Sequence, residues 1–148
     1  MNFTGEFNNS IDPKGRASIP ARFREVLAEV HGDERLVVTK NWEDGLTAYP
    51  LSRWDEVKAN VDKWPAGPKK SAAMHMMVSP AAVCGLDKQG RIQIPESLRA
   101  YAGLQKEIVV VGMADKIEIY SQAKHAEVTR SAAALIKADP QFMADMGF

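Results

Sequence analysis

The chain has 148 residues, of which 45% are hydrophobic and 26% charged, as is typical of a globular protein with one ordinary core or two very small fused units. Lysine plus arginine equals aspartate plus glutamate at 19 each, so total charge does not indicate nucleic-acid binding, and only local charge can support it. The longest apolar stretch, 108–114, is far below the roughly 20 residues that span a bilayer, and the start lacks a secretory signal, so we expect a cytoplasmic protein without a membrane partner.

The first distinctive feature along the chain is a basic turn. Asp12 followed by Pro13 suits the opening of a tight turn, and Gly15 can supply a positive φ. Residues 16–19 then alternate polar and apolar, which predicts a half-buried strand with Arg16 facing away from the core. Four cations face one carboxylate between residues 12 and 24, a local charge of +3: Lys14, Arg16, Arg22 and Arg24.

A short helix and two strands are expected next. Pro20 fits the first turn of a helix, because no hydrogen-bond donor is lost there. The apolar residues of this helix fall at i, i+3, i+4 and i+7, which places them on one face: Phe23, Val26, Leu27 and Val30. Residues 36–39 and 46–50 follow as apolar strands.

A second helix, over 51–64, carries an apolar stripe that includes Trp54 and Trp64, which favours packing over base stacking for these two indoles. Ser52 with Asp55 three residues later resembles a capping box. The proline-rich and glycine-containing stretch 65–70 is the best candidate for the boundary between the two repeats described below. A short helix over 72–77 should follow, with its methionines as core fillers, and a longer helix over 123–136 near the end.

The chain repeats itself. Residues 11–20 align with 86–95 without a gap, so that Asp12, Gly15 and Arg16 correspond to Asp87, Gly90 and Arg91. The later strands also correspond, 36–39 to 108–111 and 46–50 to 117–121. Because each copy is too small to bury a core alone, we expect two repeats, 1–65 and 66–148, to pair about a pseudo-twofold axis as one compact body.

The paired Asp-x-x-Gly-Arg motifs, each opening a strand that leads to proline, resemble those of the MraZ family of bacterial regulators. The segments 3–7 (Phe-Thr-Gly-Glu-Phe) and 103–107 (Gly-Leu-Gln-Lys-Glu), and Tyr-Pro-Leu at 49–51 with Trp54, also look like MraZ, so the resemblance covers the chain to about residue 124. It implies an α+β fold of the AbrB type, in which two tandem swapped-hairpin repeats form a pseudo-twofold β core with peripheral helices. It also implies a ring of identical subunits.

The function that the resemblance implies is transcriptional regulation at the nucleoid, without catalysis. Family members bind short direct repeats of double-stranded DNA in the promoter of the division and cell-wall gene cluster. The family ties the arginine that closes the first motif to DNA binding, which carries over to Arg16. We extend this role by motif symmetry and local charge to a set of DNA-binding candidates: Lys14, Arg16, Lys88, Arg91, Arg22 and Arg24. The turn residues are expected to be structural: Asp12, Gly15, Asp87 and Gly90.

The role of the motif arginines has two interpretations. Arg16 can present its planar fork to a phosphate or a guanine, whereas the more mobile Lys14 better suits the phosphate backbone. Alternatively, Arg16 pairs with Asp12 across the turn and only holds the shape of the loop. The second motif has Gln89 where the first has Lys14, so the residue before its glycine is neutral, and Arg91 is assigned to DNA binding by its symmetry with Arg16.

Other function classes receive less support. Asp12 and Asp87 could form a carboxylate dyad of a hydrolase, but nearby lysines would keep both carboxylates ionised. The single Cys84 and the scattered histidines give no metal-ligand spacing, and no phosphate-binding loop is present, so we expect no cofactor, metal or small-molecule substrate. An antitoxin-like module of the same fold group, which binds a partner protein as well as an operator, remains as the alternative.

Overall fold

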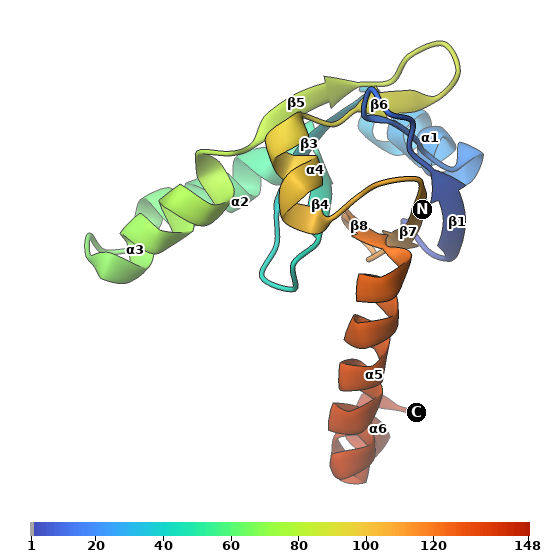
Figure 1. Ribbon diagram of the computed structural model, residues 1–148. Coiled ribbons are helices and arrows are strands. Elements are labelled where there is room, and N and C mark those ends of the chain that lie inside the picture. Colours follow the sequence, from blue (N-terminus) through green and yellow to red (C-terminus); the bar gives the residue numbers. More distant parts are fainter. Residues whose placement is uncertain (1) are drawn as a thin grey trace.

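The computed structural model describes residues 2–148 (Figure 1). Its elements follow in this order: β1 (Glu6–Ser10), β2 (Arg16–Ser18), α1 (Ala21–Val26), the π-helical turn η1 (Leu27–His31), β3 (Arg35–Lys40), β4 (Leu46–Pro50), α2 (Leu51–Lys63), α3 (Pro68–Ala73), the π-helical turn η2 (Met74–Val78), β5 (Ala82–Gly85), β6 (Arg91–Gln93), α4 (Glu96–Ala102), β7 (Glu107–Gly112), β8 (Ile117–Ser121), α5 (Gln122–Ala138) and α6 (Pro140–Met146).

The two halves of the chain interlock in their sheets. Six antiparallel strands lie in the order β1-β7-β8-β4-β3-β5, so each half gives its first strand to the other: β1 pairs with β7, and β5 pairs with β3. The strands β4 and β8 pair at the centre, and β2 pairs with β6 in a separate two-stranded sheet. The predicted α+β fold with swapped hairpins and a pseudo-twofold β core is therefore confirmed.

The core lies on the inner face of these sheets and takes equivalent side chains from both repeats. Five such pairs are buried: Ile19 and Ile94, Phe23 and Leu98, Leu36 and Ile108, Leu46 and Ile117, and Ala48 and Ile119. Cys84 is also buried, as expected of a packed thiol, and burial raises its pKa to about 11. Because both copies contribute to a single core, neither half buries its apolar face without the other.

The helices that follow the two motifs begin where expected, with a difference of one residue. Pro20 and Pro95 immediately precede α1 and α4 rather than lying inside their first turns. Three of the four predicted apolar residues of the first helix are buried, but Val30 is 48% exposed. The π-helical turn η1 explains the error, because its wider winding rotates Val30 away from the face that Phe23 occupies.

The second helix differs from its prediction at both ends. The capping box is absent, because the residue that precedes α2 is Pro50 and no side chain caps the first amides. Trp54 is buried as predicted, but α2 ends at Lys63 and Trp64 is 60% exposed. The short helix is present as α3 and η2, although two of its three methionines, Met74 and Met76, are exposed rather than in the core.

Two helical arms leave the sheet in different directions (Figure 1). One consists of α2 and α3, and the other of α5 with α6 beside its far end. The helix predicted over 123–136 is confirmed within α5. No helix in the stretch 2–148 combines the length and apolar character needed to cross a membrane. The division into repeats at residue 65 stays a prediction.

Candidate nucleic-acid interface

The first motif forms a turn organised around one carboxylate. Oδ1 of Asp12 accepts hydrogen bonds from the backbone amides of Lys14 (3.0 Å) and Arg16 (2.9 Å). The backbone closes the same loop, because the amide of Gly15 donates to the carbonyl of Asp12 over 2.9 Å. Oδ2 of Asp12 then accepts from Nε of Arg16 at 2.6 Å. The aspartate thus holds both the loop and the arginine that closes it.

The second motif repeats this arrangement. Oδ1 of Asp87 accepts from the amides of Gln89 and Arg91, both at 2.9 Å, and Oδ2 accepts from Nε of Arg91 at 3.1 Å. One contact has no counterpart in the first turn: Nη2 of Arg91 donates to Oε1 of Gln89 over 3.3 Å. The neutral residue that made this motif differ in sequence therefore holds its arginine against the loop.

The two turns lie side by side because β2 pairs with β6. In this ladder Arg16 faces Gln93, and Ser18 faces Arg91. Outside the ladder, the amide of Ile19 donates to the carbonyl of Gly90 (3.0 Å), and the amide of Ile94 donates to that of Gly15 (2.8 Å). Nη1 of Arg91 also approaches Oδ2 of Asp12 to 3.9 Å. These hydrogen bonds and the ion pair join the two turns into one unit with a defined spacing.

A second pair of arginines crosses between the repeats. Arg24 of α1 donates from Nε to the carbonyl of Ile19 and covers Gly90, where a Cβ would lie 2.6 Å from its guanidinium carbon. Arg99 of α4 donates to the carbonyl of Ile94 and covers Gly15, where a Cβ would meet Nε at 2.5 Å. Arg99 was not among the predicted site residues, although extending the alignment of 11–20 with 86–95 along both copies pairs it with Arg24 and could have identified it.

The structure brings most of the predicted cations to this unit. Lys14 and Lys88 are exposed at the tips of the two turns, and neither forms an ion pair with a carboxylate of residues 2–148. Arg22 is exposed on α1, and no hydrogen bond or ion pair within the described chain joins it to either turn. We define the basic cluster as the cations of the paired turns and of the arginines that cover them: Lys14, Arg16, Arg24, Lys88, Arg91 and Arg99.

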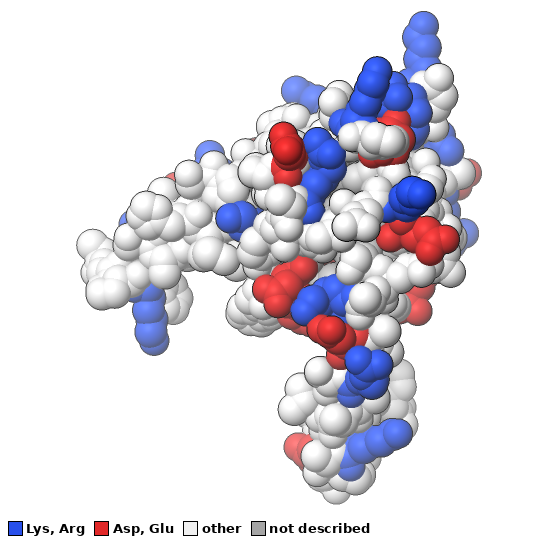
Figure 2. Space-filling view, in the orientation of Figure 1, with Lys and Arg blue, Asp and Glu red and all other residues white. Residues whose placement is uncertain are grey.

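The basic cluster carries six positive charges around two carboxylates, a net charge of +4 on a chain whose total charge is zero. Figure 2 shows lysine and arginine gathered over the end of the molecule where β6 lies in Figure 1. Acidic side chains are visible mostly below this end, towards the junction with α5. A concentration of positive charge on one end of a neutral protein favours contact with a polyanion.

The two motif arginines differ in what remains available for a ligand. Within residues 2–148 Arg16 uses only Nε for a hydrogen bond, so its Nη1 and Nη2 edge has no acceptor, and its side chain is 37% exposed. Arg91 uses Nε and Nη2 in its own turn, has Nη1 near Asp12, and is 25% exposed. The turn-holding and ligand-facing roles are therefore compatible in Arg16, whereas Arg91 is more fully engaged by the two turns themselves.

The electrostatics of the turns disfavour a carboxylate dyad. Hydrogen bonds from the Arg16 amide first, and then from its guanidinium, hold the pKa of Asp12 below its usual value. The pKa of Asp87 is lowered in the same way, chiefly by the Arg91 amide. A dyad that shares one proton needs a carboxylate with a raised pKa, which is the opposite of what these turns produce. Within residues 2–148 no cluster of three metal-ligating side chains is present.

Comparisons with known proteins agree with this architecture. The model of the family described as "MraZ protein, putative antitoxin-like" matches two stretches of the chain, 2–74 and 77–144. Proteins named transcriptional regulator MraZ are similar to this chain over most or all of their lengths. The one from Syntrophotalea carbinolica is 49% identical, with 100% of both chains covered, and the one from Geobacter sulfurreducens is 37% identical, with 98% of this chain and 99% of the relative covered. The one from Pediococcus pentosaceus is 42% identical, with 84% and 85% covered.

The packing of Arg99 on Gly15 can be tested by adding a methyl group. We expect Gly15→Ala to reduce the free energy of unfolding by more than Gly32→Ala, because both glycines have a positive φ but only Gly15 has neighbours within 4 Å of the new Cβ. The backbone cost shared by both variants is about 1 kcal/mol. Urea unfolding of the two variants measures the difference, and equal losses would contradict close packing between α4 and the first turn.

The lowered pKa of Asp12 predicts a pH dependence. A carboxyl group with a depressed pKa in the folded state stabilises the fold above its unfolded pKa and loses this effect as pH falls through the folded pKa. Asp12→Asn should therefore be less stable than the wild type at pH 7. The difference in stability between the two proteins should shrink as the pH falls below about 4, where Asp12 of the wild type becomes protonated. Thermal unfolding at pH 7, 5, 4 and 3 checks this, with Asp55→Asn on the exposed side of α2 as the control for a lost carboxylate.

Proposed function

Because the chain belongs to the MraZ family, we propose that it is a sequence-specific DNA-binding transcriptional regulator that binds double-stranded DNA with its paired turns. The observation that carries this proposal is the basic cluster, a net charge of +4 at one end of a chain whose total charge is zero. The similar proteins of the family are named as transcriptional regulators. Regulation of transcription also implies a location in the cytoplasm at the nucleoid, which forms part of the proposal.

The chemistry assigns different tasks to the cations of the cluster. Arg16 offers an unengaged Nη edge, whose two parallel N–H groups match the O6 and N7 acceptors of guanine or two phosphate oxygens. Lys14 and Lys88 stand at the exposed tips, where a mobile point charge suits the phosphate backbone. Arg24 and Arg99 are more confined, since each lies over a glycine of the opposite turn. They mainly maintain the spacing of the turns and add to the local potential.

Tight binding in this proposal requires several subunits to contact the DNA together. A few cations on one chain neutralise few phosphates, so a single subunit would bind weakly at physiological salt. We propose that several subunits form a ring and that each contacts one of several direct repeats in the promoter of the division and cell-wall gene cluster. Once one subunit is bound, the others bind at a high effective concentration, which converts weak contacts into tight binding.

The antitoxin-like alternative receives less support from the fold. An interaction module of that kind would carry an extended segment for its protein partner. The last third of the second half instead forms α5 and α6, with Ser121 capping the first helix and Asp139 capping the second. The wording "antitoxin-like" belongs to the family description, and no feature of the described helices favours a toxin over DNA as ligand.

The assignment of Arg16 predicts a selective loss of DNA binding. On a duplex from the region upstream of the chain's own coding sequence, Arg16→Ala should weaken binding by about tenfold or more, the loss expected for one good bidentate contact. Fluorescence anisotropy measures the affinity, and Arg130→Ala, an exposed arginine on α5, is the control for lost charge. Arg16→Lys separates the two chemistries, because lysine can replace a phosphate contact but not a bidentate guanine contact.

Folded Arg16→Ala protein that binds like the wild type would remove Arg16 from the interface. Arg91→Ala provides the comparison between the two motifs, since its side chain is already engaged by Asp87 and Gln89. We expect this variant to lose stability in the second turn and to lose less affinity than Arg16→Ala. Thermal unfolding of each variant separates loss of the turn from loss of the contact.

The number of DNA repeats provides an independent prediction. A duplex with several direct repeats should bind at least about a hundredfold more tightly than a duplex with one, because the additional contacts are intramolecular. The affinity for the duplex with several repeats should also fall more steeply with salt, since more phosphates are neutralised. Titrations of matched duplexes of equal length, with one to four repeats, measure both effects. Equal affinities for all duplexes would contradict binding by several subunits at once.

A further inference from the structure

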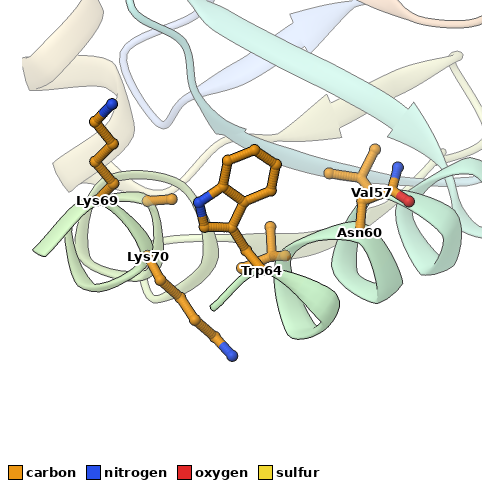
Figure 3. Close-up of a pocket in the computed structure, with 7 residues that line it drawn as sticks. Val57, Asn60, Trp64, Lys69 and Lys70 are labelled. Atoms are coloured by element: carbon orange, nitrogen blue, oxygen red, sulfur yellow. The ribbon is translucent and has the colours of Figure 1, made fainter. Parts of the chain in front are cut away.

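An apolar groove lies between α2 and α3, on the arm opposite the C-terminal helices. Figure 3 shows its labelled side chains, with the indole of Trp64 between the two helices and the lysines of α3 at one side. The groove has a volume of about 350 Å³ and is lined by Val57, Asn60, Val61, Trp64, Lys69, Lys70 and Ala73. We call this surface the α2–α3 groove. It plays no part in the paired turns.

The α2–α3 groove continues along α2. A neighbouring hollow of about 370 Å³ shares Val57, Val61 and Ala73 with it and extends to Trp42 and Met113. Trp42 is 84% exposed, and Trp64 at the other end is 60% exposed. An apolar surface of this extent that is open to water marks an interaction site rather than ordinary surface.

A second unpartnered apolar surface lies on α6. Phe142 and Met146 are four residues apart, so they lie on the same face of the helix, and they are 52% and 57% exposed. Phe148 follows at 84% exposed. We call these three residues the C-terminal strip. The only charged side chains in the segment 139–148 are Asp139 and Asp145, so the strip is accompanied by negative charge.

The two surfaces are complementary in shape and charge. The groove is a concave apolar surface bordered by Lys69 and Lys70, and α3 contains no carboxylate. The C-terminal strip is a convex surface with two aromatic side chains, which are typical anchors for such hollows, and it carries carboxylates. One chain cannot join them, because Figure 1 shows the arm of α3 and the arm of α6 projecting from the sheet in different directions.

We propose that the α2–α3 groove receives the C-terminal strip of a second copy of this chain. The contact is head-to-tail, because a different surface of each copy is used, and such contacts leave one free groove and one free strip at the ends of every open chain of subunits. If the rotation between copies closes, they form a ring. The inference rests on the oligomer of the proposed function and names the surfaces that would hold it together.

The test uses two full-length variants that each remove one side of the contact. Trp64→Glu disables the groove and leaves the strip, whereas Phe142→Asp with Met146→Asp disables the strip and leaves the groove. Sedimentation velocity measures their masses. The wild type should be a closed oligomer, and each variant alone should be a monomer. A mixture of the two should form a heterodimer, because one intact groove and one intact strip remain.

Any of three results would overturn the inference: a monomeric wild type, a groove variant that keeps the wild-type mass, or a mixture of the two variants that stays monomeric. A milder pair of changes covers the case in which a variant does not fold. Lys69→Glu with Lys70→Glu should weaken assembly at least tenfold, and adding Asp145→Lys to the same chain should restore it at low salt. Absence of the rescue also contradicts the contact.

DNA binding distinguishes failure of this inference from failure of the proposed function. Arg16→Ala should keep the wild-type mass and lose affinity for DNA. The groove variant, Trp64→Glu, should sediment as a monomer and keep the weak affinity of one subunit for a duplex with a single repeat. If all proteins assemble as expected but none binds DNA, the proposed function fails and the contact between copies stands. If DNA binds but the masses do not change, the contact fails alone.

Discussion

The pairing of β2 with β6 is the constraint on which the rest of the molecule depends. These two three-residue strands belong to different halves of the chain, and they bring the two Asp-led turns to one place. The hydrogen bonds from Ile19 to Gly90 and from Ile94 to Gly15 extend the pairing beyond the strands. Without it each turn would be an isolated loop with two or three cations, whereas with it six cations occupy one end of the molecule. Local charge of this kind increases both the affinity for a polyanion and the rate of encounter.

Exchange between the halves recurs at every level of the fold. Each half gives its first strand to the sheet of the other, and each motif helix sends an arginine over the glycine of the opposite turn. Because the two halves are nearly symmetric, the positions at which the two motifs differ indicate different roles. Gln89 holds Arg91 in place, whereas Lys14 leaves the Nη edge of Arg16 unengaged among the described residues. The two copies of one motif are thus suited to different tasks, one more structural and one more exposed.

The helical arms stand apart from this symmetric centre. The first contains α2 and α3, the second α5 and α6, and they differ in length and in exposed surface. An arm with an apolar groove and an arm with an apolar strip give a single chain two unlike ends. A symmetric core that carries unlike arms is suited to head-to-tail assembly, in which the paired turns of successive copies are presented at a regular spacing.

Much of this could be predicted from the sequence. The gapless alignment of residues 11–20 with 86–95 determined the repeat, and turn chemistry then indicated the conformations around Asp12 and Asp87, because an aspartate side chain bonds amides two and four residues ahead in the same loop. Period-two alternation identified β2, and the alignment of the two copies placed β6 at the equivalent residues. These features are local: each depends on residues that are neighbours in the chain.

Only the tertiary structure decided the features that depend on distant neighbours. The π-helical turn η1 exposed Val30, and the end of α2 at Lys63 exposed Trp64, although hydrophobic periodicity placed both on buried faces. The placement of Arg24 and Arg99 over the glycines of the opposite turns depends on how α1 and α4 pack across the pseudo-twofold axis. Periodicity reports which residues are apolar at helical spacing, but burial depends on what another segment places against them. That information lies in the packing of the whole chain.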